Sequence, residues 1–295
     1  MTDIAVRVAY RGEGFYGSQM QPGLSTVEGT LLANIIRVTE MEPGDICLRL
    51  ASRTDKGVSA TGNVASFESG GADPVNLLKA LNSVHGGVLC TAYAKVDDDF
   101  TPRHADRRTY EYVAKAHGLD ADVANECLSM FRGRRDFSGF CKAEGKDPVI
   151  DLTRADAVVD GDVLIMTFEA DHFLWNMVRR ISAAVLRAAS GRMPVSRIEE
   201  ALAGGWSNFG IAPAEGLTLT DVFYDGLDFI PSPDPALAYR KADGLYSARL
   251  AERFYGKLRW GPRSQRNPEG RGFVRGFGGS PRLRRISAWT WACRS

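Results

Sequence analysis

The sequence is poor in the residues that build disulfide frameworks and metal sites. Its 295 residues include five cysteines and four histidines. The cysteines lie far apart and no Cys-x-x-Cys pair occurs, so we expect no disulfide framework, no zinc site and no other metal. No apolar run approaches the ~20 residues that span a bilayer. Because the chain enters a strand-like alternation at once, it leaves no room for a signal peptide, and we expect a cytoplasmic protein.

The chain also lacks a charge excess of one sign, since its formal net charge is +1. The charge is uneven, however: residues 261–295 hold eight arginines and one glutamate, a net of +7, which leaves −6 for residues 1–260. This stretch is rich in Gly, Arg, Ser and Pro without a sustained period, so we expect a disordered tail. It is either a sequence-tolerant RNA-binding arm or a solvated extension, and composition alone favours the extension.

Arginines also cluster within residues 1–260. Such a cluster is most often a solvated face, and the more specific interpretation is contact with phosphate. The clusters comprise Arg103, Arg107 and Arg108; Arg132, Arg134 and Arg135; and Arg179, Arg180, Arg187 and Arg192.

Hydrophobic periodicity predicts that residues 1–104 form one β-α-β-β-α-β unit. Alternation of apolar residues from Ile4 indicates a half-buried strand. Ser25 and Glu28 have the spacing of a capping box, which predicts a helix start there, and Asp73 followed by proline predicts a second helix. The expected strands are residues 4–10, 48–51, 64–67 and 88–95.

Residues 105–260 are predicted to repeat that order. Asp160-Gly161 between two alternating runs is a strong hairpin signal, and the longest helix should run from Phe173 to Ala189 with Gly191 just past its end. The expected elements are strands at 109–116, 151–159, 163–170 and 217–224 and helices at 121–132, 173–189 and 196–203. The predicted fold class is α+β, with two ferredoxin-like halves that share a central, mainly antiparallel sheet and a catalytic cleft between them.

A polar turn at residues 51–60 separates two of these strands and holds Asp55 at a sheet end. Catalytic groups concentrate in loops on rigid scaffolds. The simpler interpretation is a β-turn in which the aspartate accepts a backbone hydrogen bond and Gly57 takes a positive φ, and local evidence alone favours it.

Other stretches, taken together with this turn, point to a function. With Arg53-Thr54-Asp55-x-Gly57-Val58, they resemble the motifs of the tRNA pseudouridine synthase A family, and the resemblance runs from about residue 6 to residue 224. The matching stretches lie within residues 15–22, 106–112, 136–140, 173–180 and 212–217. The chain departs from the motifs that many bacterial members carry at Ser52, Lys56, Ser59 and Arg135, which leaves the choice of substrate uridines open.

The resemblance implies a homodimeric isomerase that converts uridines to pseudouridine at positions 38, 39 and 40 in the anticodon stem-loop of tRNA, without metal or organic cofactor. Carried over residue by residue, Asp55 matches the essential nucleophilic aspartate, Tyr110 the tyrosine that stacks on the target base, and Arg179 the basic residue that pairs with the aspartate. Arg53 matches an arginine that helps to hold the RNA or the flipped nucleotide. The remaining residues that we assign to substrate binding are Gln19 and Leu217.

Pseudouridine formation breaks the bond from N1 to C1′, turns the uracil, joins C5 to C1′ and releases the C5 proton. An ionised carboxylate can attack C1′, add to C6 of the ring or deprotonate the sugar to give a glycal, and the sequence does not rank these routes. Two alternatives are the same reaction at other RNA positions and a non-catalytic RNA-binding protein that keeps the cleft. An aspartate-based hydrolase lacks a second catalytic carboxylate at a recognisable spacing.

Overall fold

The computed structural model describes residues 3–205, 208–234 and 244 of the chain. The chain divides into two compact units, residues 1–243 and 244–295, and the fold is described for the first. The predicted tail at 261–295, with its boundary at 260, lies outside the described residues. None of the helices within the described ranges is long and apolar enough to cross a membrane.

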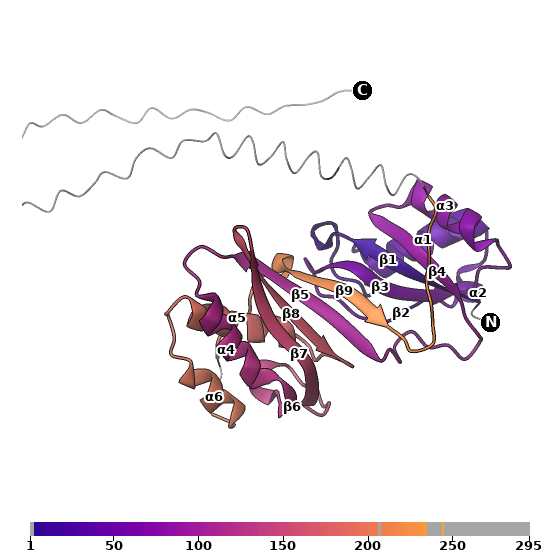
Figure 1. The fold of residues 1–295 in the computed structure, drawn as a ribbon. Helices are drawn as coiled ribbons and strands as arrows, with labels where there is room; N and C mark the ends of the chain where they lie inside the picture. The colour runs from indigo at the N-terminus through magenta and orange to yellow at the C-terminus, as the bar shows by residue number, and fades with distance from the viewer. Residues whose placement is uncertain (1–2, 206–207, 235–243, 245–295) are drawn as a thin grey trace, which may run out of the picture. The chain divides into compact units, whose positions relative to one another are not determined.

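Within these ranges the strands form one ten-stranded sheet (Figure 1). They are β1 (Ile4–Tyr10), β2 (Arg49–Leu50), β3 (Ser59–Phe67), β4 (Val88–Lys95), β5 (Arg107–Lys115), β6 (Gly133–Asp136), β7 (Val149–Asp160), β8 (Val163–Ala170), β9 (Leu217–Phe223) and β10 (Ile230–Pro231). The order across the sheet is β10-β4-β1-β3-β9-β5-β8-β7-β6, and β2 pairs with β3. The pairing of β3 with β9 is parallel and the other pairings are antiparallel. The prediction of a mainly antiparallel sheet is confirmed.

The parallel pair joins two groups of strands with the same internal order. One group is β4-β1-β3-β2 and the other is β9-β5-β8-β7, so that β9 lies between β3 and β5 (Figure 1). The pair is short, with Ser59 facing Thr218 and Ala60 facing Leu219. Because β3 begins at Ser59, the turn that carries Asp55 leads directly into this junction.

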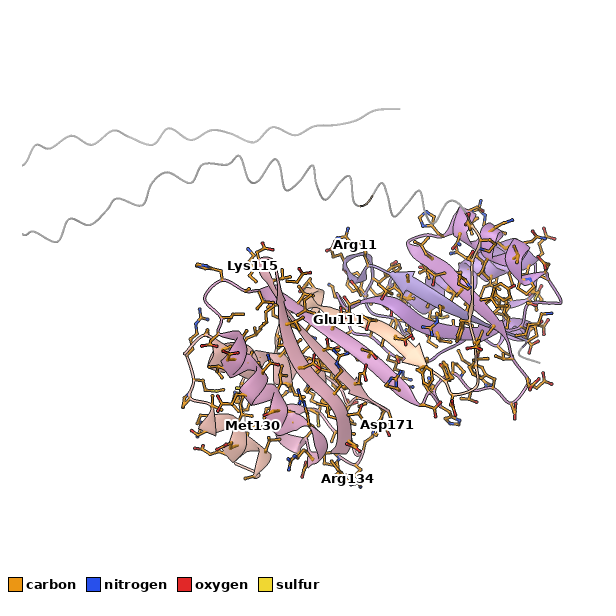
Figure 2. The ribbon with its side chains drawn as sticks, viewed as in Figure 1. Arg11, Glu111, Lys115, Met130, Arg134 and Asp171 are labelled. Atoms are coloured by element: carbon orange, nitrogen blue, oxygen red, sulfur yellow. The ribbon has the colours of Figure 1, made fainter. Side chains whose placement is uncertain are left out.

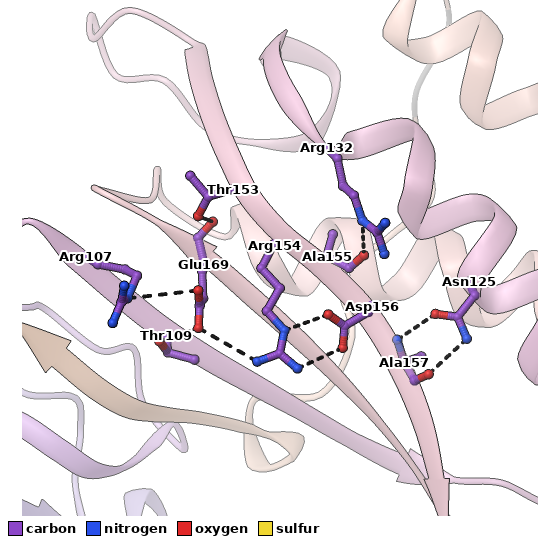
Figure 3. A network of polar contacts seen from close by, with 10 residues as sticks. All are labelled: Arg107, Thr109, Asn125, Arg132, Thr153, Arg154, Ala155, Asp156, Ala157 and Glu169. Carbon is purple, nitrogen blue, oxygen red and sulfur yellow. Dashed lines mark hydrogen bonds and ion pairs between the residues drawn. The ribbon is translucent and has the colours of Figure 1, made fainter.

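Helices pack on both groups. They are α1 (Val27–Thr39), α2 (Pro43–Ile46), α3 (Pro74–Val84), α4 (Ala121–Phe131), α5 (Met177–Ala189) and α6 (Ser196–Leu202). α1 and α3 contact each other and β4, whereas α4 contacts β7 and α5, and α5 contacts β5. Asn125 secures α4, because its amide exchanges hydrogen bonds of 2.9 and 2.8 Å with the carbonyl O and N–H of Ala157 (Figure 3).

The start of α1 differs from the prediction. Thr26 caps the helix, and its hydroxyl accepts a hydrogen bond from Gly29 N at 3.2 Å. The expected capping box of Ser25 and Glu28 is therefore wrong. Glu28 instead accepts a bond from Met20 N at 2.8 Å and ties the preceding loop to the helix.

The start of α5 differs as well. The helix begins at Met177 rather than Phe173, because Asn176 takes a left-handed φ of 61° that an α-helix does not accept. Lys142 also forms a β-bridge with Trp175. Residues 173–176 are therefore a loop that leads into the helix.

The side chains of β5 that alternate with the buried Arg108 and Tyr110 face the other side of the sheet. Glu169 of β8 lies there between two arginines, 3.9 Å from Nε of Arg107 and 3.8 Å from Nη1 of Arg154 (Figure 3). Glu111 projects from β5 on the same face (Figure 2). These ion pairs are long and partly exposed, and pairs open to solvent stabilise a fold by about 1 kcal/mol or less, so this network contributes little to the stability of the sheet.

Candidate active site

Asp55 lies between β2 and β3 on a turn that does not use its carboxylate. The turn is closed by a hydrogen bond of 3.1 Å from Val58 N to the main-chain O of Asp55, and Gly57 takes a φ of 86°. The β-turn expected from the sequence is thus present. The acceptor that closes it belongs to the main chain, so the side chain remains available for other partners.

The loop after β1 holds this turn in place. Thr54 N donates to Ser18 Oγ at 2.8 Å and Ser18 N donates to Thr54 O at 3.0 Å. The two loops touch at Gly12, where a Cβ would lie 2.3 Å from the carbonyl carbon of Gly57. Only a glycine lets the two backbones approach so closely, and this contact restricts the position of Asp55.

Two side chains from the segment before and within α5 bind the Asp55 carboxylate. Nη1 of Arg179 lies 3.3 Å from Oδ2, and Nε1 of Trp175 donates to Oδ1 at 3.1 Å. The Asp55 side chain is 35% exposed and the Arg179 side chain 18%. The carboxylate therefore faces solvent in part, while a cation compensates its charge.

The stretch at 212–217 positions Arg179. Its Nε donates to the carbonyl O of Ala212 at 2.9 Å, and Ala212 N donates to the main-chain O of Arg179 at 3.1 Å. A third bond, from Nη1 to Oδ1 of Asn176 at 3.2 Å, holds the guanidinium from the helix start. Arg179 is thus held toward Asp55 by the protein before any substrate arrives.

Tyr110 of β5 is a buried member of the same site. The residue is 7% exposed, and its ring meets the ring of Phe173 edge-on, with centroids 5.1 Å apart. Burial raises the pKa of the phenol above its ordinary value, and a hydrogen bond with Ser52 offsets only part of that increase. The phenol is therefore neutral at physiological pH.

Arg108 connects the strand of Tyr110 to the Asp55 loop. The side chain is buried, and all five of its N–H groups are used. The acceptors are Ser52 Oγ at 3.0 Å and the carbonyl oxygens of Ala51, Arg103, Ala105 and Asp171. The interpretation of Arg108 as a phosphate contact is wrong, because its donors already bind the protein.

These residues line a cleft of about 640 Å³. The structure brings all the site residues predicted from the sequence to its walls, where Gln19 and Arg53 are exposed and Leu217 is buried. The complete set is Gln19, Arg53, Asp55, Tyr110, Arg179 and Leu217. Sequence reasoning missed the roles of three further residues. Trp175 lies in a matching stretch but carries no local signal, Ser52 was noted only as a departure from the motif, and Arg108 only as a member of a basic cluster.

Some of the residues that the sequence analysis singled out lie outside the cleft. Phe137 and Phe140, from the stretch at 136–140, are buried against Phe131 and build the core. Arg107 pairs with Glu169 on the open face of the sheet. In the part of the chain that the structure describes, no group of three or more His, Cys, Asp or Glu side chains is placed to hold a metal ion.

Known proteins show what this chain is similar to. The family model described as tRNA pseudouridine synthase matches residues 128–225. The chain is 38% identical over 230 residues to tRNA pseudouridine synthase A of Thermococcus kodakarensis, an alignment that covers 77% of this chain and 86% of that protein. The chain belongs to the tRNA pseudouridine synthase A family. Its identity to the Methanocella arvoryzae protein of the same name is 41% over 231 residues, covering 76% of this chain and 85% of that protein.

Membership of the tRNA pseudouridine synthase A family confirms the resemblance that the motifs carry. The family member from Pyrococcus abyssi is 36% identical over 259 residues, which cover 86% of this chain and 94% of that protein. Among solved structures, an archaeal box H/ACA sRNP Nop10-Cbf5 complex matches with 15% identity and a TM-score of 0.33, covering 72% of this chain and 49% of that chain. That likeness is too weak to bear on the fold.

Proposed function

We propose that this member of the tRNA pseudouridine synthase A family isomerises uridine to pseudouridine at positions 38, 39 and 40 of the tRNA anticodon stem-loop. The observation that carries the proposal is the Asp55 carboxylate, paired with Arg179 at the wall of a cleft that Tyr110 also lines. Relatives named tRNA pseudouridine synthase A support the reaction class. Residues 1–104 and 105–260 both supply walls of the cleft, and we propose that each forms a ferredoxin-like half.

Asp55 is the nucleophile in this proposal. Its ionised carboxylate attacks C1′, adds to C6 or deprotonates the sugar, and all three routes need a negative charge that the nearby guanidinium of Arg179 compensates. The partial exposure of Asp55 toward the cleft supports direct access to a nucleotide. The isomerisation has no net redox change, so it needs no redox cofactor, and the family resemblance implies neither metal nor organic cofactor.

A uridine in a stem has to be turned out of the helix to reach Asp55. Stacking on an aromatic ring contributes about 1–3 kcal/mol per base and offsets part of the cost of unstacking. Tyr110 supplies that ring and takes the C5 proton, directly or through water. Because burial keeps the phenol neutral at rest, it acts as a base only after its own proton has passed to water in the cleft, and water returns a proton to N1 of the detached uracil.

The partner is tRNA, and the active form is a homodimer of cytoplasmic protein, as the family resemblance implies. Arg53, Arg103, Gln19 and Leu217 line the cleft. In this proposal the two arginines contact the RNA backbone, while Gln19 and Leu217 contact the flipped nucleotide. Because phosphate contacts release counterions, affinity for tRNA should fall with increasing salt.

The test is tritium release from an anticodon stem-loop transcript labelled at uracil C5, comparing wild type with Asp55→Ala and the isosteric Asp55→Asn. Release by wild type alone is expected, and transcripts with cytidine at positions 38–40 serve as the substrate control. Release from the cytidine transcripts would instead indicate other uridines. Specific binding without release by any variant would favour a non-catalytic RNA-binding protein.

A further inference from the structure

Trp175 is a large aromatic residue whose exposure is not explained by packing in the core. It is 44% exposed, although burial of an aromatic ring is among the strongest contributions to folding. The only polar atom of the side chain, Nε1, donates to Oδ1 of Asp55 at 3.1 Å, although the two residues are 120 positions apart in the sequence. The indole thus stands at the surface of the cleft with its donor on the proposed nucleophile.

The local backbone is built to present this indole. Lys142 N donates to the carbonyl O of Trp175 at 2.9 Å, and Lys142 Nζ lies 4.3 Å from the centroid of the indole ring. The next residue, Asn176, takes the left-handed φ that prevents α5 from starting earlier. Contacts on both its backbone and its ring therefore hold Trp175 outside the helix.

The two donors bind different oxygens of the Asp55 carboxylate. Arg179 takes Oδ2 and Trp175 takes Oδ1, so rotation of the carboxylate plane would break one bond or the other. Trp175 adds no charge, whereas Arg179 already compensates the charge of Asp55. Each carboxylate oxygen keeps further acceptor capacity for the substrate.

We propose that Trp175 is a positioning residue, whose indole N–H holds Asp55 in the orientation from which it attacks the nucleotide. This inference rests on the proposed function of Asp55. In an alternative role, the exposed ring itself would stack on RNA. The two roles can be distinguished, because different substitutions remove the N–H and the ring. Trp175→Phe removes the donor and keeps an aromatic ring, and Trp175→Leu removes both.

The first test is single-turnover tritium release at saturating transcript, with the dissociation constant measured in parallel. Hydrogen bonds to charged groups are worth enough to change a rate by about 10- to 100-fold. We expect both variants to lose about that factor in rate, with dissociation constants within about 3-fold of wild type. A wild-type rate for Trp175→Phe would overturn the inference, as would an effect confined to weaker binding by Trp175→Leu.

The second test needs no turnover. The indole N–H resonance of Trp175, assigned by its absence in Trp175→Phe, should move in Asp55→Asn and stay in place in Asp171→Asn, which changes a nearby exposed carboxylate. An unmoved resonance in Asp55→Asn would show that the contact is not made.

Failure of wild type to release tritium from any tRNA overturns the proposed function and this inference together. Release by wild type and equally by Trp175→Phe overturns this inference alone.

Discussion

Asp55 and Tyr110, the two side chains that we propose to react, differ in burial. Asp55 keeps about a third of its side chain in solvent and has a cation beside it, which suits a carboxylate that has to be ionised. Tyr110 is almost fully enclosed, and burial raises its pKa. Its phenolate is therefore rare at neutral pH, but it is a strong base when it forms. Burial thus keeps the Tyr110 phenol protonated at neutral pH, in the same cleft where Asp55 is partly open to solvent.

Replacing Tyr110 tests this assignment. Tyr110→Phe should slow C5 tritium release by about 100-fold or more, the usual contribution of a general base, while binding RNA nearly as well as wild type. Tyr110→Ala should in addition weaken RNA binding, because it removes the stacking surface. Because the pKa of Tyr110 is raised, only a small fraction of the phenol is ionised between pH 7 and 9. That fraction grows with pH, so the wild-type rate should increase over this range. Release by Tyr110→Phe at the wild-type rate would leave only the stacking role.

At the scale of elements, the site depends on two loops whose backbones touch. Gly12 and Gly14 lie in one 3₁₀ turn (Gly12–Gly14), and their surroundings differ. A Cβ at Gly12 would clash with the backbone of Gly57 at 2.3 Å, whereas a Cβ at Gly14 would meet nothing within 4 Å. The first glycine therefore sets the distance between the loop after β1 and the Asp55 turn.

Alanine at these two positions forms a matched pair. Gly12→Ala should destabilise the fold by about 2–3 kcal/mol, the upper part of the range for overpacking, and should lower activity by displacing Asp55. Gly14→Ala should change stability by less than about 0.5 kcal/mol. Urea unfolding together with tritium release measures both. Equal effects of the two substitutions would show that the loops do not touch at Gly12.

A second matched pair concerns adjacent residues of β5. Arg108→Met should destabilise the fold by about 3 kcal/mol, because it leaves several buried carbonyl groups without donors. Arg107→Met should cost about 1 kcal/mol or less, since its ion pair with Glu169 is long, at 3.9 Å, and partly exposed. Denaturant midpoints compare the two variants. A smaller loss for Arg108→Met than for Arg107→Met would mean that the buried guanidinium does not clamp the Asp55 loop.

At the scale of the whole molecule, one sheet runs through both strand groups, and the β3–β9 pair joins them. The site is assembled across this junction: Asp55 comes from the first group, and Tyr110 and Arg179 come from the second. The core extends along the same sheet and contains a buried thiol, Cys90 of β4. Burial raises the pKa of Cys90 to about 12, so the stability of the unit depends on pH.

The free energy of unfolding should fall at alkaline pH. An unfolded cysteine loses its proton near pH 8.5, whereas Cys90 in the folded state keeps it until about pH 12. The stability that this proton contributes is therefore fully present below about pH 8.5 and is lost above it, by up to about 1.4 kcal/mol per pH unit. Urea unfolding between pH 7 and 10 should show a shallower decline for Cys90→Ala than for wild type. Cys47→Ala, at an exposed thiol, should keep the wild-type slope, and identical slopes for all three proteins would contradict the prediction.

The sequence by itself determined most of the local elements and the family. Alternation and helical periodicity are properties of neighbouring residues, which is why the strand at residues 4–10 and the hairpin after Asp160 could be predicted. The compact motif around Asp55 carried the family resemblance. The start of α5 was missed because a left-handed asparagine and a bridge to Lys142 outweighed a helical pattern.

Only the tertiary structure decided which side chains meet. Trp175 and Asp55 are 120 positions apart, and no periodicity relates them. Arg108 looked like one member of a basic cluster, yet the strand order places it beneath the Asp55 loop, where the Ser52 hydroxyl and four carbonyl groups take all its donors. Contacts of this kind depend on how distant elements pack and on which polar groups lose water there. The physical reason is that burial and hydrogen-bond partners are properties of the folded chain, whereas propensity and periodicity belong to the local sequence.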